Sequence, residues 1–293
     1  MLNMLQRLLP ARAGVPTFGK LAMEWRRTLK GRWSREAGRI LDRHILPAIG
    51  DLPADKVILR DCSMIVEALT ATPGIHNHAV AIMKRVFKWS RKTGRFPGAN
   101  PADDLGKLHL EARERELTNA ELRQLWSLAP YLGDWGLVCR LILLTGRRPG
   151  EIGGLTWDAV VYGPALYLGR TKNKKGYVVP LSPLAASFLP RRRDGHPHLF
   201  GTIEGKPFNG WGAGNKKWKS LTRAKCPWYP HALRKTAATR MGGLGVPDEV
   251  IERILGHKPP GVTRRHYNFA QRLEEQRDAL ERWAAELERI ISS

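Results

Sequence analysis

Apolar residues recur at helical spacing through the first third of the chain. Thr17 is suited to cap a helix with one apolar face, formed by Phe18, Leu21, Ala22 and Trp25. We predict further helices over residues 34–46, ending before Pro47, then after Asp61, and over residues 78–92. The segment 44–53 contains proline and glycine at short intervals, which predicts a turn.

The predicted helix over residues 78–92 combines an apolar stripe with a basic face. The stripe is formed by Val80, Met83, Val86 and Phe87, and Gly94 is expected to end the helix. The basic side chains are Lys84, Arg85, Lys88, Arg91 and Lys92. By itself this pattern is typical of a solvated surface helix. In a DNA-binding protein it favours contacts with phosphates.

Prolines and glycines within residues 96–106 predict the end of an all-helical domain, followed by a linker. Thr118 and Glu121 then fit a capping box at the start of a second domain. Residues 137–144 predict an apolar helix that ends at Gly146.

The hydrophobic period changes in the second domain. Residues 165–168 and 177–181 predict two short strands, joined by a hairpin with a very basic tip. Helices resume over residues 231–241 and 248–255, and Gly256 is suited to cap the second of them. The expected fold class is therefore mostly α with a small β-sheet (α+β).

The last segment, residues 271–293, differs from the rest in charge. It holds four arginines and six acidic residues, and an apolar seam repeats near every 3.5 residues. Such a helix is poorly suited to bind DNA. Two placements follow equally well from the pattern: the helix packs on its own domain, or it docks on a neighbouring protomer.

The charge of the whole chain indicates a polyanionic partner. Lysine and arginine number 49 against 27 acidic residues, a formal charge of +22. Residues 1–110 carry 19 basic and 9 acidic residues, so the excess is spread over both parts. Nucleic acid is favoured over a membrane because no basic amphipathic helix has lipid-facing bulk. No apolar run approaches the ~20 residues of a membrane span, and a cytoplasmic, nucleoid-associated protein is expected.

Metal and cofactor sites are not expected. The three cysteines are scattered without CxxC spacing, which argues against both a disulfide framework and a zinc site. Two His-x-His pairs, at residues 76–78 and 196–198, have no cysteine nearby to complete a metal site. We interpret both pairs as ordinary polar positions.

A few residues have the chemistry needed to break a phosphodiester without a metal. Arginine neutralises nonbridging oxygens with two parallel hydrogen bonds, and Arg148 and Arg234 each lie in a local pattern. A tyrosine such as Tyr267 attacks as a phenolate if nearby cations favour it, and a hairpin lysine such as Lys172 can protonate the leaving oxygen. Each pattern alone is also explained by a surface ion pair, a helical i,i+3 pair or a structural tyrosine.

In combination and in this order, these residues resemble the tyrosine recombinase (phage integrase) family over residues 115–270. The resemblance rests on the string from Thr145 to Glu151, Lys172 in the basic hairpin, His231-x-x-Arg234, Leu255-Gly-His257 and Tyr267. A softer resemblance relates residues 17–108 to the helical core-binding domain of that family.

The resemblance implies a division of the chain and a shape. An N-terminal extension would cover residues 1–16, a helical core-binding domain 17–108, a linker 109–116, the catalytic domain 117–270 and a tail for protomer contacts 271–293. The helical bundle and the larger mixed domain would close as a C-shaped clamp on DNA. With about 16 residues before the first domain, we expect either that an arm-binding domain is absent or that the chain has been shortened.

The resemblance also implies a role for each site residue. Tyr267 would form a 3′-phosphotyrosyl bond and release a 5′-hydroxyl. Arg148, Arg234 and His257 would bind the phosphate, and His231 would accept or donate a proton. Lys172 would be the general acid, with Lys174 and Lys175 as competitors for that role and as DNA contacts. Glu151 would support the site, and neither ATP nor metal would be needed.

The spacing from His257 to Tyr267 departs from the commonest pattern of the family. It is ten residues, one more than usual, with Pro-Pro-Gly at residues 259–261. We interpret this as altered loop geometry with activity retained.

The expected function is a site-specific recombinase for integration, excision or resolution of DNA elements. It would act as a homo-tetramer on two double-stranded sites with inverted repeats, and as a monomer or weak oligomer without DNA. Accessory DNA-bending or directionality proteins are possible partners. The alternatives are a type IB topoisomerase-like relaxing enzyme and a non-catalytic DNA-binding regulator on the same fold.

Overall fold

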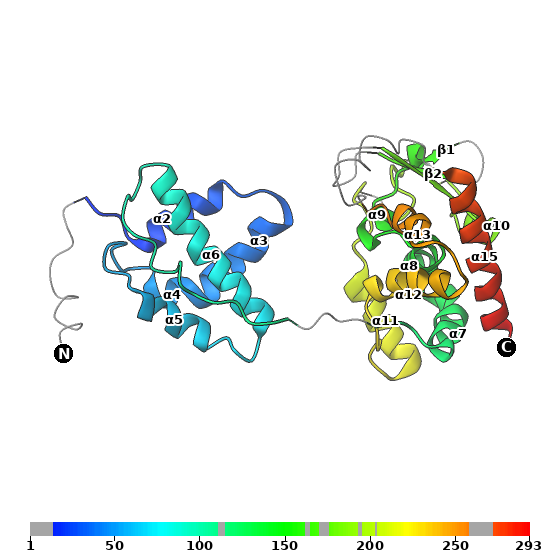
Figure 1. The fold of residues 1–293 in the computed structure, drawn as a ribbon, viewed down its shortest axis with the longest axis horizontal. Helices are drawn as coiled ribbons and strands as arrows, with labels where there is room; N and C mark the ends of the chain where they lie inside the picture. The colour runs from blue at the N-terminus through cyan, green and yellow to red at the C-terminus, as the bar shows by residue number, and fades with distance from the viewer. Residues whose placement is uncertain are drawn as a thin grey trace. The chain divides into compact units, whose positions relative to one another are not determined.

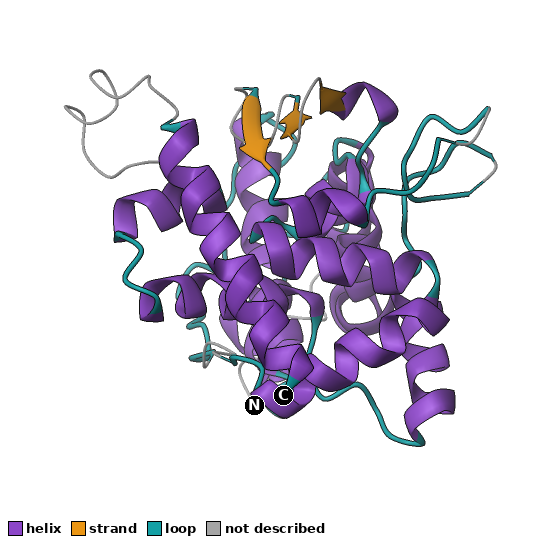
Figure 2. Ribbon diagram, turned by 90° about the vertical axis from the view of Figure 1, so that its right-hand side faces the viewer, coloured by secondary structure: helices purple, strands orange, loops and turns teal. Residues whose placement is uncertain are grey.

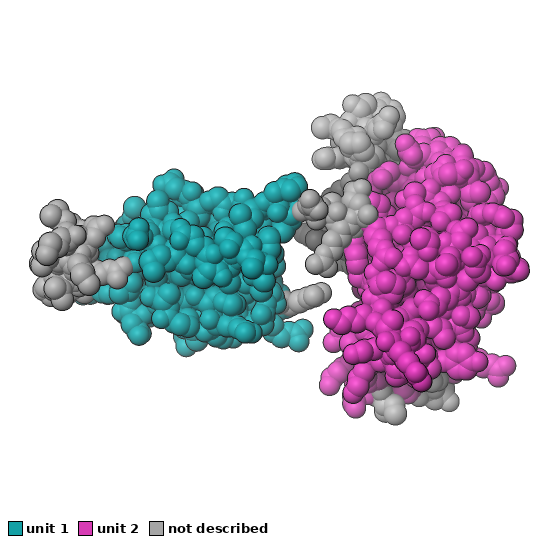
Figure 3. Space-filling view, turned by 90° about the horizontal axis from the view of Figure 1, so that it is seen from below, with its two compact units in different colours: residues 1–112 teal, residues 113–293 magenta. Residues whose placement is uncertain are grey.

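The chain forms two compact units in a computed structural model, residues 1–112 and 113–293 (Figure 3). The structure describes residues 14–110, 115–161, 165–169, 176–192, 195–202, 204–257 and 272–293. Each unit has its own hydrophobic core. Among the described residues no helix is long and apolar enough to cross a bilayer.

The first unit is helical (Figure 1). Its elements are α2 (Phe18–Arg27), α3 (Gly31–Ile40), the π-helical η1 (Leu41–Ile45), α4 (Leu46–Ile49), α5 (Leu59–Glu67) and α6 (Pro73–Lys92). The predicted cap is confirmed, because the Thr17 side chain accepts a hydrogen bond from the Lys20 amide at 3.2 Å. The apolar face of α2 packs on α6, where Phe18 and Phe87 have ring centroids 5.2 Å apart.

The predicted turn at residues 44–53 is wrong up to Ile49. The helical run continues from η1 into α4, and the π-helical turn of η1 lies just before Pro47, the residue that has no amide hydrogen to donate. The helix predicted after Asp61 instead begins at Leu59. The reason is that Asp61 caps it from the third position, accepting from the Ile58 amide at 3.1 Å. The predicted helix 78–92 begins earlier, at Pro73.

In the second unit a small sheet lies at one edge of a group of helices (Figure 2). Strands β1 (Val160–Val161), β2 (Ala165–Leu168) and β3 (Tyr177–Pro180) form an antiparallel sheet in that order. The helices are α7 (Asn119–Leu128), η2 (Ala129–Leu132), α8 (Asp134–Thr145), α9 (Pro149–Gly153), η3 (Trp157–Ala159), α10 (Pro183–Ser187), α11 (Trp211–Thr222), α12 (Pro230–Gly243), α13 (Asp248–Leu255) and α15 (Leu273–Ser292). The expected α+β class is confirmed. Strand β1 was not predicted because two residues are too few to show a period.

Helix α15 packs on its own unit, beside α7, α8, α12, α13 and β3 (Figure 1). Its predicted apolar seam lies in the core, where the Trp283 indole is fully buried and donates to the Leu143 carbonyl at 2.8 Å. The buried Gln276 side chain accepts from the Tyr177 hydroxyl at 2.9 Å. The structure therefore selects the first of the two placements.

Helix α11 packs so closely on α8 that one of its glycines has no room for a methyl group. A Cβ at Gly214 would overlap the Trp135 indole, whereas a Cβ at Gly212 meets nothing within 4 Å. We expect Gly214→Ala to lower the free energy of unfolding of this unit by about 1–3 kcal/mol, as overpacking does. The control Gly212→Ala should raise it by about 0.5–1 kcal/mol, because alanine favours the helix. Urea unfolding followed by tryptophan fluorescence measures both. Equal effects would contradict the packing.

Candidate active site

The turn between α8 and α9 presents Arg148. Helix α8 ends at Gly146, which adopts a left-handed conformation with φ +62°, and Arg148 is the N-cap of α9. Glu151 Oε2 accepts from the Arg148 amide at 3.2 Å, and Oε1 accepts from Arg148 Nη1 at the same distance. The side chain of Arg148 stays 37% exposed. Glu151 therefore orients a guanidinium that remains accessible to a ligand.

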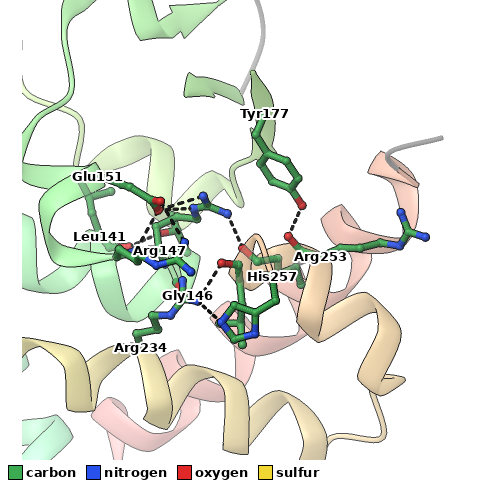
Figure 4. Close-up of polar contacts among 12 residues, drawn as sticks. Leu141, Gly146, Arg147, Glu151, Tyr177, Arg234, Arg253 and His257 are labelled. Carbon is green, nitrogen blue, oxygen red and sulfur yellow. Dashed lines mark hydrogen bonds and ion pairs between the residues drawn. The ribbon is translucent and has the colours of Figure 1, made fainter. Parts of the chain in front are cut away.

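Arg147 also belongs to the site, although no sequence pattern predicts a role for it. Its side chain is 1% exposed and its Nη2 lies 2.9 Å from Glu151 Oε2. Its Nη1 donates to the Ile254 carbonyl at 2.8 Å, and the guanidinium lies over the Tyr177 ring (Figure 4). Burial lowers the pKa of Arg147. The sequence contains no signal for this position, because two adjacent arginines look alike until the fold buries one of them.

Arg234 is 3% exposed and lies at the centre of the site, on α12. Its Nη1 donates to the Gly146 carbonyl and its Nη2 to the Leu255 carbonyl, both at 2.8 Å (Figure 4). Burial, with smaller contributions from the charges of Arg148 and Arg147, lowers its pKa to about 10, so the group stays charged at neutral pH. Within the described ranges no carboxylate pairs directly with this buried guanidinium. An anion bound here would meet an uncompensated charge.

Two histidines flank Arg234. His257 directly follows the Gly256 cap of α13; its Nε2 lies 2.8 Å from Arg234 Nη2 and its Nδ1 lies 2.6 Å from Glu252 Oε2. Glu252 was not predicted either. His231 lies in the first turn of α12, and partial burial lowers its pKa, followed by the charges of Arg234 and Arg148. A histidine with a lowered pKa is neutral near pH 7 and can accept a proton.

The structure brings together the predicted residues from α9, α12 and the end of α13: Arg148, Glu151, His231, Arg234 and His257. Lys172, Lys174, Lys175 and Tyr267 lie outside the described residues. The predicted DNA contacts of α6 belong to the first unit. There the Lys84 ammonium donates to the Asp103 carbonyl at 2.8 Å, whereas Arg85, Lys88, Arg91 and Lys92 are exposed.

The chain is similar to known integrases in both sequence and fold. It is 25% identical to prophage integrase IntA of Escherichia coli K12 over 264 residues, 84% of this chain and 63% of that protein. It is 28% identical to the integrase of Haemophilus phage HP1 over 203 residues, 66% of this chain and 56% of that protein. The chain thus spans roughly three fifths of the length of these relatives.

The fold has a counterpart among solved structures. A lambda integrase tetramer bound to a Holliday junction matches with a TM-score of 0.67 and 16% identity, over 86% of this chain and 78% of that one. The sequence profile of the phage integrase family matches residues 115–273, which hold all the predicted catalytic residues. This match covers more than half of the sequence, and the chain belongs to the phage integrase family.

Proposed function

We propose that this protein is a site-specific recombinase that cleaves and rejoins double-stranded DNA through a 3′-phosphotyrosyl intermediate. One observation carries the proposal: Arg148 and the buried, uncompensated Arg234 lie together with His231 and His257 in a member of the phage integrase family. A scissile phosphate is an anion that can accept hydrogen bonds from both guanidinium groups.

In the proposed reaction the Tyr267 oxygen attacks the phosphorus and the bond from phosphorus to the 5′-oxygen breaks. His231 accepts the phenol proton, and the leaving 5′-oxygen takes a proton from Lys172. Arg148 and Arg234 donate to the nonbridging oxygens, on which charge builds in the transition state. Attack by a second 5′-hydroxyl on the phosphotyrosine reverses these transfers and reseals the strand. The arginines supply the charge stabilisation, so we propose no cofactor.

We propose that the exposed basic face of α6 contacts DNA phosphates, together with Lys174 and Lys175. Lys88 is exposed on this face, whereas Lys84 is held against the Asp103 carbonyl. Lys88→Ala is expected to weaken DNA binding about equally for all sequences and to reduce the slope of log affinity against log salt by about one. Lys84→Ala is the matched control, and fluorescence anisotropy at several salt concentrations gives both slopes. An unchanged slope in Lys88→Ala would exclude it as a phosphate contact.

We further propose a homo-tetramer on two inverted-repeat DNA sites as the active assembly, formed from monomers or weak oligomers in the cytoplasm. The tetrameric state of the lambda integrase of similar fold on its junction supports this assembly. The helical unit would bind DNA as a core-binding domain and close a C-shaped clamp with the catalytic unit. Accessory DNA-bending or directionality proteins would bias the reaction toward integration, excision or resolution.

Covalent trapping tests the proposed function. The full chain is incubated with a pool of nicked duplex oligonucleotides from the DNA that flanks its gene, and adducts that survive detergent are isolated and sequenced. A recombinase should enrich one inverted-repeat site and exchange strands between two copies of it. Relaxation of supercoiled DNA without strand exchange would favour the topoisomerase-like alternative. Sequence-specific binding without any adduct would favour the regulator.

A further inference from the structure

Glu252 and Arg234 hold the His257 ring from opposite sides. Arg234 Nη2 lies 2.8 Å from Nε2 of the ring, and Glu252 Oε2 lies 2.6 Å from Nδ1. A guanidinium nitrogen can only donate, so Nε2 accepts here and the ring proton is on Nδ1, facing the carboxylate. The two neighbours together fix the tautomer of His257 in the free protein.

This arrangement changes if a bound phosphate accepts a hydrogen from Arg234 Nη2. Arg234 Nη2 carries two hydrogens, and both are used, one by the Leu255 carbonyl and one by His257. A phosphate oxygen that takes the second hydrogen leaves the Nε2 lone pair facing another acceptor. His257 can then donate to the phosphate only if Nε2 takes up a proton while Nδ1 keeps its hydrogen bond to Glu252. Both ring nitrogens are donors only in the charged imidazolium.

One cationic and one anionic side chain contact the ring directly. Arg234 contacts the ring from α12, His231 lies near it on the same helix, and Arg147 lies beside the backbone of Gly256, the residue before His257. The Glu151 carboxylate pairs with Arg147 and Arg148. In the described part of the chain, Glu252 is the carboxylate in direct contact with the ring.

We propose that Glu252 is a positioning residue for His257, holding the ring with Nε2 toward the phosphate site and balancing its charge when phosphate binds. The proton comes from solvent and goes to Nε2, and no bond other than this N–H forms or breaks. The proposal rests on the proposed function, since it assumes that His257 donates to the scissile phosphate.

The first test uses the free protein and needs no DNA. The full chain is labelled with ¹⁵N in its nine histidines, and the His257 signals are assigned by their loss in His257→Asn. In wild type, the unprotonated ring should carry its proton on Nδ1. Glu252→Gln keeps an oxygen that can accept from Nδ1 but removes the charge, so His257 should take up its second proton at lower pH than in wild type. Inorganic phosphate should promote that proton uptake in wild type and do so less in the variant.

The matched control is Glu288→Gln, an exposed glutamate of the same unit on α15. It should titrate and respond to phosphate like wild type. Identical His257 titrations in wild type and Glu252→Gln would overturn the proposal, as would a ring proton on Nε2 in the free wild-type protein. Both measurements are independent of catalysis.

The second test uses the DNA site recovered by covalent trapping. Glu252→Gln should form the adduct about 10- to 100-fold more slowly, with DNA affinity unchanged, by analogy with metal-bound histidines that lose their outer carboxylate partner. The difference in rate between wild type and Glu252→Gln should shrink as pH falls, because a higher proton concentration protonates His257 without the carboxylate. A normal rate at every pH would overturn the positioning role. Absence of adducts from wild type on any DNA would refute the proposed function while the titration result still stands.

Discussion

Replacing Tyr267 by phenylalanine is expected to abolish formation of the covalent protein–DNA adduct while leaving DNA affinity within about twofold of wild type. The substitution removes the only oxygen of the side chain, so no bond to phosphorus can form at this position. The aromatic ring is kept, and contacts of basic side chains with phosphates dominate DNA affinity. Denaturing gels of a labelled nicked substrate report the adduct, and anisotropy reports the affinity.

Tyr131→Phe is the matched control for this experiment. Tyr131 is a tyrosine of the same unit and is 65% exposed, so its hydroxyl is open to solvent. The control should form the adduct at the wild-type rate. An adduct in Tyr267→Phe would show that another residue is the nucleophile, and peptide mapping of the DNA-linked fragment would then locate it.

The second large effect is expected from Arg234→Lys. A lysine ammonium cannot reproduce the planar donors that reach the carbonyls of Gly146 and Leu255 and the ring of His257. We expect adduct formation to slow by about 10²–10³-fold, as for the loss of one preorganised donor in a transition-state site. Unsatisfied buried acceptors should also lower the free energy of unfolding by about 1–3 kcal/mol.

Arg240→Lys provides the comparison on the same helix. Arg240 pairs with Glu116 at 2.6 Å and its side chain is 28% exposed, away from the site. In Arg240→Lys, the rate of adduct formation and the free energy of unfolding should stay close to those of wild type. Urea unfolding and single-turnover adduct formation are measured on both variants. A wild-type rate in Arg234→Lys would remove this arginine from the proposed phosphate clamp.

The placement of α15 links the C-terminal segment to the arginines of the site. The Tyr177 hydroxyl donates to Gln276 of α15, and the Tyr177 ring lies against the guanidinium of Arg147. Arg147 in turn shares the Glu151 carboxylate with Arg148. Because α15 begins shortly after Tyr267 in the chain, its docking fixes where the segment that carries the proposed nucleophile ends.

Local patterns in the sequence determined much of the fold. Strand β2 and helix α13 were predicted with their observed ends, because a strand period, a terminal glycine and the first turn of a helix are all local signals. The predicted turn at residues 44–53 is wrong up to Ile49. The local sequence pattern around a proline is the same whether the proline ends a helix or lies near the start of one. Only the burial of Leu41, Ile45 and Ile49 in the core selects the helix.

For the site, the sequence alone determined which residue types stand in which order, and therefore the family and the candidate chemistry. Only the tertiary structure showed that Arg147 is buried beside Glu151, that Glu252 contacts His257, and that α15 packs on its own unit. Each of these facts depends on contacts between residues of different elements or on the direction of a side chain at the end of a helix. Spacing along the chain encodes the faces of an element, but the partner that meets each face is set by how the elements pack.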